Sequence, residues 1–130
     1  MTQEQKDLLL KDLSARLPYG VKVESVFINP DTKEHKSCGI EVFDATSMLM
    51  IRDGLGEFKP YLFPLSSMTE DQKEEFNTQS LKLQLQVIDE EIMYEKATEF
   101  EVDFYNKHHL DWRGLIPMGL ANDATGLNIY

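Results

Sequence analysis

The N-terminal part of the fold is decided by residues 2–28, which read TQEQKDLLLKDLSARLPYGVKVESVFI. Thr2 followed three residues later by Gln5 forms a capping box, in which the two side chains satisfy free backbone N–H groups at a helix start. Leucines at positions 9, 13 and 17 then repeat at helical spacing, and Pro18-Tyr19-Gly20 ends the pattern. The sequence therefore predicts a helix over residues 3–17.

Beyond Gly20 the apolar period changes from helical to alternating, which predicts a strand over residues 21–28. Turn residues follow at 29–31, and shorter apolar runs at 39–43 and 48–51 predict two further strands. Three short strands at intervals of about ten residues are typical of a small antiparallel sheet. A sheet of this size is found in SH3-like folds. Whether the sheet curls as it does in those folds is left open.

A proline-flanked apolar stretch follows at residues 59–65, KPYLFPL. Its two prolines remove backbone donors and hold the chain extended, so we expect neither a helix nor a central strand. Its many apolar side chains favour burial. We therefore expect an extended strap that lies against the core.

The next segment, residues 67–94, carries mixed signals. Ser67 with Glu70, or Thr69 with Gln72, predicts a capped short helix that ends near residue 77. Residues 81–87, LKLQLQV, alternate strictly between apolar and polar side chains, which predicts a half-buried strand. Ile92 and Tyr94 would continue the alternation after a turn at residues 89–91.

A last helix is predicted over residues 99–109, because Thr98 and Glu101 form another possible capping box. Gly114 and Pro117 prevent its continuation. Helical spacing places three side chains on one apolar face: Phe100, Phe104 and His108. Together these elements predict an α+β fold in a single domain over residues 1–130, with the N-terminal and C-terminal helices packed on the sheet.

Composition narrows the classes of function. The chain has 130 residues, 42% of them hydrophobic, and a net charge of −10, which disfavours binding to nucleic-acid phosphates. Residues 70–103 hold 11 acidic residues against three lysines, which makes either a solvated face or a surface for a basic partner. The lone Cys38, the polar N-terminus and the absence of an apolar run of ~18 residues predict a soluble cytoplasmic protein without membrane contact.

Chemically versatile side chains are concentrated in residues 104–118, FYNKHHLDWRGLIPM. Tryptophan and arginine are enriched at binding hot spots, so we interpret the exposed part of this block as a candidate binding site. Its predicted residues are His109, Asp111, Trp112 and Arg113. His109 is also expected to cap the helix end as a cation.

A metal site in this block, formed by His108, His109 and Asp111, is the alternative. Neighbouring histidines on a helix point about 100° apart, which is unsuited to one ion, so no metal is predicted. No cofactor and no catalytic residue are predicted either. Two weaker patterns are interpreted as structural. Residues 54–56 resemble a fragment of a phosphate-binding loop and are expected to form a turn, and Cys38 with His35 resembles a nucleophile and its base. A nucleic-acid interface would have to use sheet residues Lys22, Lys33, Lys36 and Arg52, against the overall charge.

Three blocks of the sequence, residues 5–23, 59–69 and 103–121, resemble a family of small uncharacterised proteins from Bacteroides-group gut bacteria and their phages or prophages. The second block reads KPYLFPLSSMT, and the third contains FYNKHHLDWRGLIPMGLA. The resemblance implies a bacterial or phage setting and marks the strap and the histidine–tryptophan block as family features. It supplies no activity and no catalytic residues.

The function expected from these observations is that of a non-enzymatic accessory protein of a phage or mobile element. It would act through contacts with a protein partner, at the acidic 70–103 face and at the corner formed by Trp112 and Arg113. The alternative is a small metal-dependent or ligand-binding enzyme that uses His108, His109 and Asp111.

Overall fold

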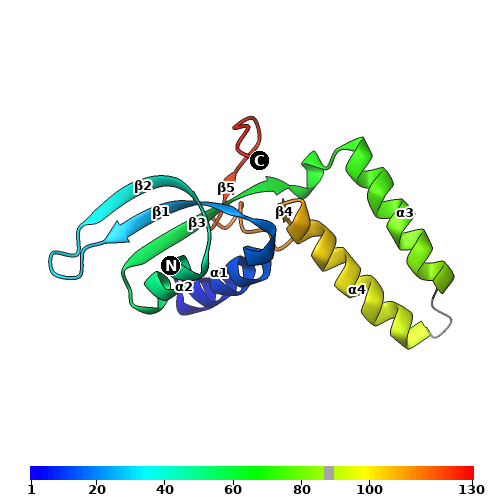
Figure 1. Ribbon diagram of the computed structural model, residues 1–130, viewed down its shortest axis with the longest axis horizontal. Coiled ribbons are helices and arrows are strands. Elements are labelled where there is room, and N and C mark those ends of the chain that lie inside the picture. Colours follow the sequence, from blue (N-terminus) through cyan, green and yellow to red (C-terminus); the bar gives the residue numbers. More distant parts are fainter. Residues whose placement is uncertain (87–89) are drawn as a thin grey trace.

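The computed structural model describes residues 1–86 and 90–130, and describes side-chain surroundings outside residues 85–97. The chain contains both helices and a sheet, and the predicted α+β class is confirmed (Figure 1). In order, the elements are α1 (Gln3–Arg16), η1 (Leu17–Tyr19), β1 (Lys22–Ile28), β2 (His35–Val42), α2 (Ala45–Arg52), β3 (Gly56–Pro64), η2 (Leu65–Ser67), α3 (Glu70–Gln86), α4 (Glu90–Lys107), β4 (Leu110–Asp111) and β5 (Asn122–Asp123).

The sheet has the order β2-β1-β3-β4, and β5 also pairs with β3. β1 runs antiparallel to β2, as predicted for the first two strands, and also antiparallel to β3, whereas β4 and β5 run parallel to β3. The sheet is therefore mixed. The β1–β2 register shifts between Ser25 and Val26, so that Cys38 lies opposite no residue and forms a bulge beside Gly39.

The core lies between α1 and the sheet. The predicted capping box at Thr2 and Gln5 is present, and it starts a helix that buries Leu9 and Leu13. These leucines belong to a cluster that also contains Val21, Val23, Phe43, Phe58, Leu62, Leu115, Leu120 and Ala121. The N-terminal prediction is confirmed, and the cluster shows that the loops after β4 complete the core.

The strand predicted over residues 48–51 is wrong, because these residues belong to α2. Asp44 caps this helix by accepting a hydrogen bond of 2.9 Å from the backbone N–H of Ser47. An apolar run as short as residues 48–51 is compatible with both the helical and the strand period. The Asp44 cap therefore determines that these residues are helical. A turn at residues 53–54 follows the helix directly, and Gly56, which was expected to lie in a turn over residues 54–56, is the first residue of β3.

The proline-flanked strap is an inner strand rather than an extended cover, which corrects the prediction. β3 pairs with β1 over residues 56–60, with β5 over residues 61–62 and with β4 over residues 63–64. Pro60 stands opposite Val23 at the end of the β1–β3 ladder, and Pro64 is the last residue of the strand. Pro60 lies where the pairing with β1 ends, and Pro64 lies where the strand ends. The strand can therefore contain both prolines without losing hydrogen bonds of the sheet.

The strand predicted over residues 81–87 is also wrong, since α3 extends as far as Gln86. Thr69 and Gln72 exchange the predicted capping hydrogen bonds, of 3.0 and 3.1 Å, and the helix continues past residue 77. Leu81 is 57% exposed, whereas Leu83 is partly buried, as expected for a helix that turns two such residues to different sides. Val87 and Asp89 lie outside the described residues.

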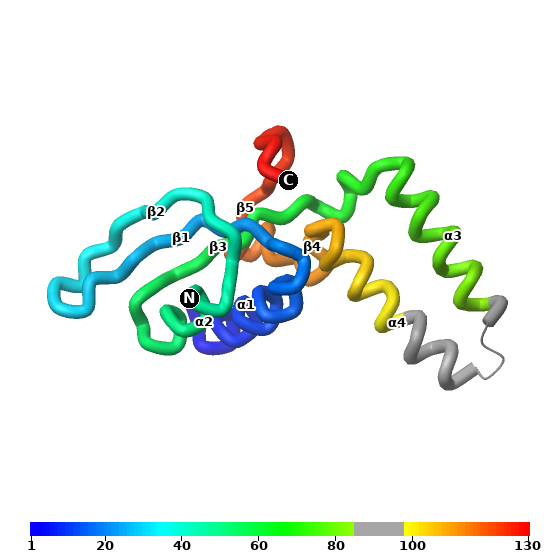
Figure 2. The backbone as a smooth tube through the Cα atoms, in the orientation of Figure 1, coloured from blue at the N-terminus to red at the C-terminus, as the bar shows by residue number. Residues whose placement is uncertain are grey.

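The last helix begins earlier than predicted. α4 starts at Glu90, so Ile92 and Tyr94 are helical rather than extended, and Thr98 stands inside the helix instead of at its start. α3 and α4 run side by side and extend away from the sheet; we call this pair of helices the arm (Figure 1). Figure 2 follows the chain from β3 out through α3 and back through α4 to β4.

The arm is held together by aromatic contacts at its base. The Phe76 ring of α3 lies 5.2 Å from the Phe104 ring and 5.4 Å from the Phe100 ring of α4. α4 thus packs mainly on α3 and reaches the sheet at its C-terminal end, instead of covering the sheet as expected. Among the helices of the described residues, none has the length and apolar character needed to cross a membrane.

Candidate functional site

The end of α4 carries the histidine–tryptophan block, and His108 occupies its predicted position. The His108 ring lies 4.6 Å from the Phe104 ring, and its side chain is 20% exposed. Its Nε2 is 3.2 Å from a Glu75 carboxylate oxygen of α3, and its Nδ1 is 3.5 Å from the Gln72 amide. The prediction that His108 packs on the aromatic face of the helix is confirmed, and the ring also links the two helices of the arm.

His109 follows α4 in a left-handed backbone conformation, with φ of 57°. Its ring stacks on the Tyr130 ring at 3.8 Å, and its carbonyl accepts a hydrogen bond from the Phe63 N–H of β3. Burial, followed by the positive charges of Arg16, His108 and Lys22, lowers the pKa of His109 to about 4. The expected cationic helix cap is therefore wrong, because the ring is neutral near pH 7.

Asp111 is buried, and its carboxylate is used within the fold. One oxygen accepts a hydrogen bond of 2.8 Å from the Leu115 N–H, and the other accepts one of 2.9 Å from the Ile116 N–H. Both bonds close the turn that follows β4 and bring Leu115 into the core. Asp111 thus shapes the chain after β4 through direct contacts with the backbone.

Trp112 and Arg113 form a compact corner. The Trp112 indole N–H donates to the Asn106 side chain at 3.0 Å, and the Arg113 guanidinium lies 4.0 Å from the Trp112 ring centre. Arg113 also donates to a carboxylate oxygen of Asp12 at 3.2 Å. The corner therefore connects the end of α4 to α1.

Asp12 lies at the centre of a buried ionic cluster that the sequence analysis did not identify. Its second oxygen accepts a hydrogen bond of 2.9 Å from Arg16, and both side chains are fully buried. Arg16 also donates to the Leu110 carbonyl of β4 at 2.7 Å. The sequence signal was an acid and an arginine four residues apart, beside Leu13 on the apolar face of the first helix.

The structure does not bring the residues of the metal alternative to a shared point. His108 faces Glu75, His109 stacks on Tyr130, and Asp111 binds backbone N–H groups. In the described part of the chain, no group of three or more histidine, cysteine, aspartate or glutamate side chains is arranged to hold a metal ion. Cys38 is exposed on β2.

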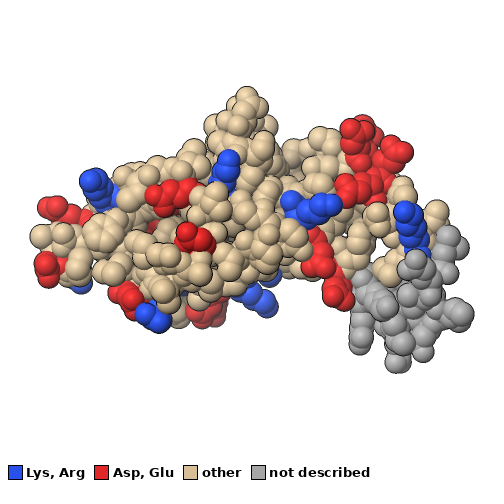
Figure 3. All heavy atoms as spheres, in the orientation of Figure 1, with Lys and Arg blue, Asp and Glu red and all other residues tan. Residues whose placement is uncertain are grey.

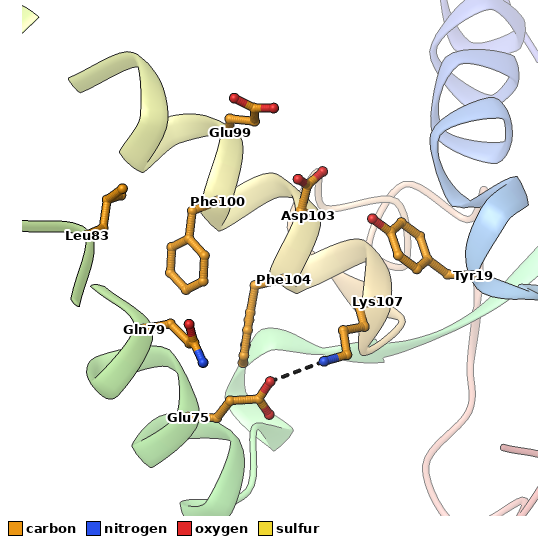
Figure 4. Close-up of a pocket in the computed structure, with 9 residues that line it drawn as sticks. All are labelled: Tyr19, Glu75, Gln79, Leu83, Glu99, Phe100, Asp103, Phe104 and Lys107. Carbon is orange, nitrogen blue, oxygen red and sulfur yellow. Dashed lines mark hydrogen bonds and ion pairs between the residues drawn. The ribbon is translucent and has the colours of Figure 1, made fainter. Parts of the chain in front are cut away.

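A concave surface lies beside this block, between the arm and η1; we call it the arm hollow (Figure 4). Its volume is about 580 Å³. The lining comes from η1, α3 and α4 and comprises Tyr19, Glu75, Gln79, Leu83, Glu99, Phe100, Asp103, Phe104 and Lys107. The arm hollow thus combines aromatic rings from η1 and α4 with carboxylates from α3 and α4.

The charges in the arm hollow are unevenly paired. Lys107 binds Glu75 with an N–O distance of 3.3 Å, whereas Glu99 and Asp103 make no ion pair with other described residues. Figure 4 shows the hydroxyl end of Tyr19 turned toward Asp103 across the hollow. Carboxylates and aromatic rings are the two kinds of group that bind organic cations, so the lining suits a positively charged side chain.

The arm hollow could not be predicted from the sequence, because residues 81–87 were expected to form a strand and Tyr19 is distant along the chain. The acidic excess over residues 70–103 was its one visible signal. Comparisons of the chain with protein-family models, curated proteins and solved structures gave no match.

Proposed function

We propose that this protein is a non-enzymatic accessory protein that acts through protein–protein contacts, with the arm as its contact surface. The observation that carries this proposal is the arm hollow, a concavity with an aromatic lining and carboxylates that make no ion pair with other described residues. Concave surfaces that combine apolar area with a few polar groups are typical binding sites. The resemblance to proteins of gut bacteria and their phages supports a phage or mobile-element setting.

The charge of the arm supports a basic protein partner. Within residues 70–86 and 98–107 there are seven acidic residues and three lysines. Figure 3 shows acidic side chains gathered over the first part of α3. Such a surface repels nucleic-acid phosphates and attracts basic protein surfaces, and the attraction raises the rate of association.

The predicted binding residues have a supporting role in this proposal. Asp111, Trp112 and Arg113 are held by contacts within the chain, and His109 lies beneath Tyr130. These contacts fix the end of α4 against α1 and β3, and so they orient the arm. Direct contact of a partner with the Trp112–Arg113 corner stays a prediction.

The proposal is tested by affinity purification of the tagged full chain from the bacteria that encode it. The arm variant Glu74→Lys/Glu101→Lys reverses two exposed charges of the arm, and the control variant Asp31→Lys/Glu34→Lys reverses two exposed charges of the β1–β2 hairpin. We expect the same protein to be captured by the wild type and the control variant, and to be lost from the arm variant. Binding of the purified partner then checks the contact directly, and a partner that binds both variants equally contradicts the proposal.

A further inference from the structure

We infer that the arm hollow receives an arginine side chain from a basic segment of the partner protein. This inference rests on the proposed function and specifies the chemistry of the contact. It follows from the lining of the hollow, from a similar contact elsewhere in the fold, and from the ion pairing of Lys107.

The first step is the arrangement of the acidic residues. Glu99 and Asp103 are four residues apart on α4, so they lie on the same side of the helix, one turn apart. Both side chains are exposed, and both line the hollow. Two carboxylates at this spacing present several acceptor oxygens to a planar guanidinium, which has five N–H donors.

The second step is the aromatic lining. Tyr19 faces Asp103, and Phe100 and Phe104 line the same hollow from α4 (Figure 4). A guanidinium is weakly hydrated and stacks on aromatic faces, whereas a lysine ammonium is strongly hydrated and acts as a point charge. The combination of ring and carboxylate therefore favours arginine over lysine.

The fold already contains one arginine that is bound in this way. Arg113 lies 4.0 Å from the Trp112 ring centre and donates to Asp12 at 3.2 Å. The arm hollow offers the same two kinds of group, a ring from Tyr19 and a carboxylate from Asp103, on surfaces that a partner can reach. In this contact the guanidinium lies against one ring and donates to one carboxylate.

The third step concerns the lysine in the lining. Among the described residues that line the hollow, Lys107 is the one cation, and it pairs with Glu75 on α3. The Glu75 carboxylate also lies 3.2 Å from the Nε2 of His108, between Lys107 and that ring. Lys107 is thus not paired with Glu99 or Asp103, and these two carboxylates make no ion pair with other described residues.

The test uses a fluorescein-labelled peptide of alternating glycine and arginine, with lysine and citrulline versions as comparisons. Fluorescence anisotropy at about 0.15 M salt, where long-range charge effects are screened, measures binding to the full chain. We expect the arginine peptide to bind most tightly and the uncharged citrulline peptide to bind least. The variant Glu99→Gln/Asp103→Asn should weaken arginine-peptide binding about tenfold, the loss expected when charge-assisted hydrogen bonds to a guanidinium are removed.

The matched control is Asp31→Asn/Glu34→Gln, which changes the net charge equally at the exposed hairpin tip. We expect it to weaken binding by less than about twofold, the residual effect of a screened distant charge. Tyr19→Leu should lower the preference for arginine over lysine, because it removes the ring. Equal losses in the two double variants, or lysine binding as tight as arginine binding, would overturn the inference.

The inference and the proposed function fail in different ways. If the captured partner binds Glu99→Gln/Asp103→Asn with wild-type affinity but not Glu74→Lys/Glu101→Lys, the arginine contact is excluded while the arm remains the contact surface. If the partner binds every variant equally, the proposed function itself is excluded. Far-ultraviolet circular dichroism of each variant shows that the helices are intact.

Discussion

Replacement of Asp12 by asparagine should destabilise the protein strongly, because it breaks a buried ionic cluster. The Asp12 side chain is fully buried, and it accepts hydrogen bonds from Arg16 at 2.9 Å and from Arg113 at 3.2 Å. Asparagine keeps the shape of the side chain and removes the negative charge between two guanidinium groups. Loss of one partner of a buried ion pair costs about 3–5 kcal/mol, because a buried charge is left without compensation.

That cost is a large share of the stability of a small domain, which is about 5–15 kcal/mol. Urea unfolding should show it clearly. With an m-value of about 2 kcal/mol per M, the urea midpoint should fall by about 1.5–2.5 M. Trp112 fluorescence reports on the same cluster, since Arg113 stacks on the only tryptophan of the chain.

The control for this prediction is Asp7→Asn, which removes an exposed carboxylate from the same helix. We expect that variant to change the free energy of unfolding by less than about 0.5 kcal/mol. If Asp12→Asn is no more destabilising than Asp7→Asn, the ionic cluster does not hold α1 to the C-terminal block, and our account of the corner is incorrect.

Three other predictions concern the C-terminal tail and the core. The imidazole of His109 should titrate near pH 4, and since the unfolded value is near 6.5, the stability from its neutral form should fall as pH drops from 6.5 toward 4; an NMR midpoint near 6.5 would contradict this. Tyr130→Phe removes the hydroxyl that donates to the Tyr61 carbonyl at 2.7 Å and accepts from the Lys22 N–H at 2.8 Å. At about 1 kcal/mol for each bond, it should cost about 2 kcal/mol in thermal or urea unfolding. Leu13→Ala should cost about 2–5 kcal/mol because Leu13 is 1% exposed, whereas Leu81→Ala, at a position 57% exposed, should change stability by less than about 0.5 kcal/mol.

The histidine–tryptophan block shows why composition is a weak guide to function. Its residue types suit metal binding, catalysis or a binding hot spot, and the sequence contains no information on their partners. In the structure Asp111 accepts hydrogen bonds from two backbone N–H groups, and Arg113 donates one to Asp12. The block joins α1, the end of α4 and the sheet, and the arm hollow lies beside it.

The sequence was a reliable guide where the deciding contacts are local. Thr2 and Gln5 cap α1 within one turn, and the leucines that follow share a face whatever lies against them. The spacing of Phe104 and His108 likewise determines their contact on α4, because the helix brings residues four apart together. These features need no knowledge of the rest of the chain.

The tertiary structure decided what depends on distant partners. Residues 81–86 alternate like a strand, yet they continue a capped helix that packs on α4, and Pro60 enters an inner strand because the strand changes partners there. The charge state of His109 follows from burial beneath Tyr130 and from Arg16, which are far away in sequence. Capping and helical spacing act between near neighbours and are therefore visible in the sequence. Strand pairing, burial and the placement of Tyr19 and Asp103 in one hollow arise only when the chain is folded.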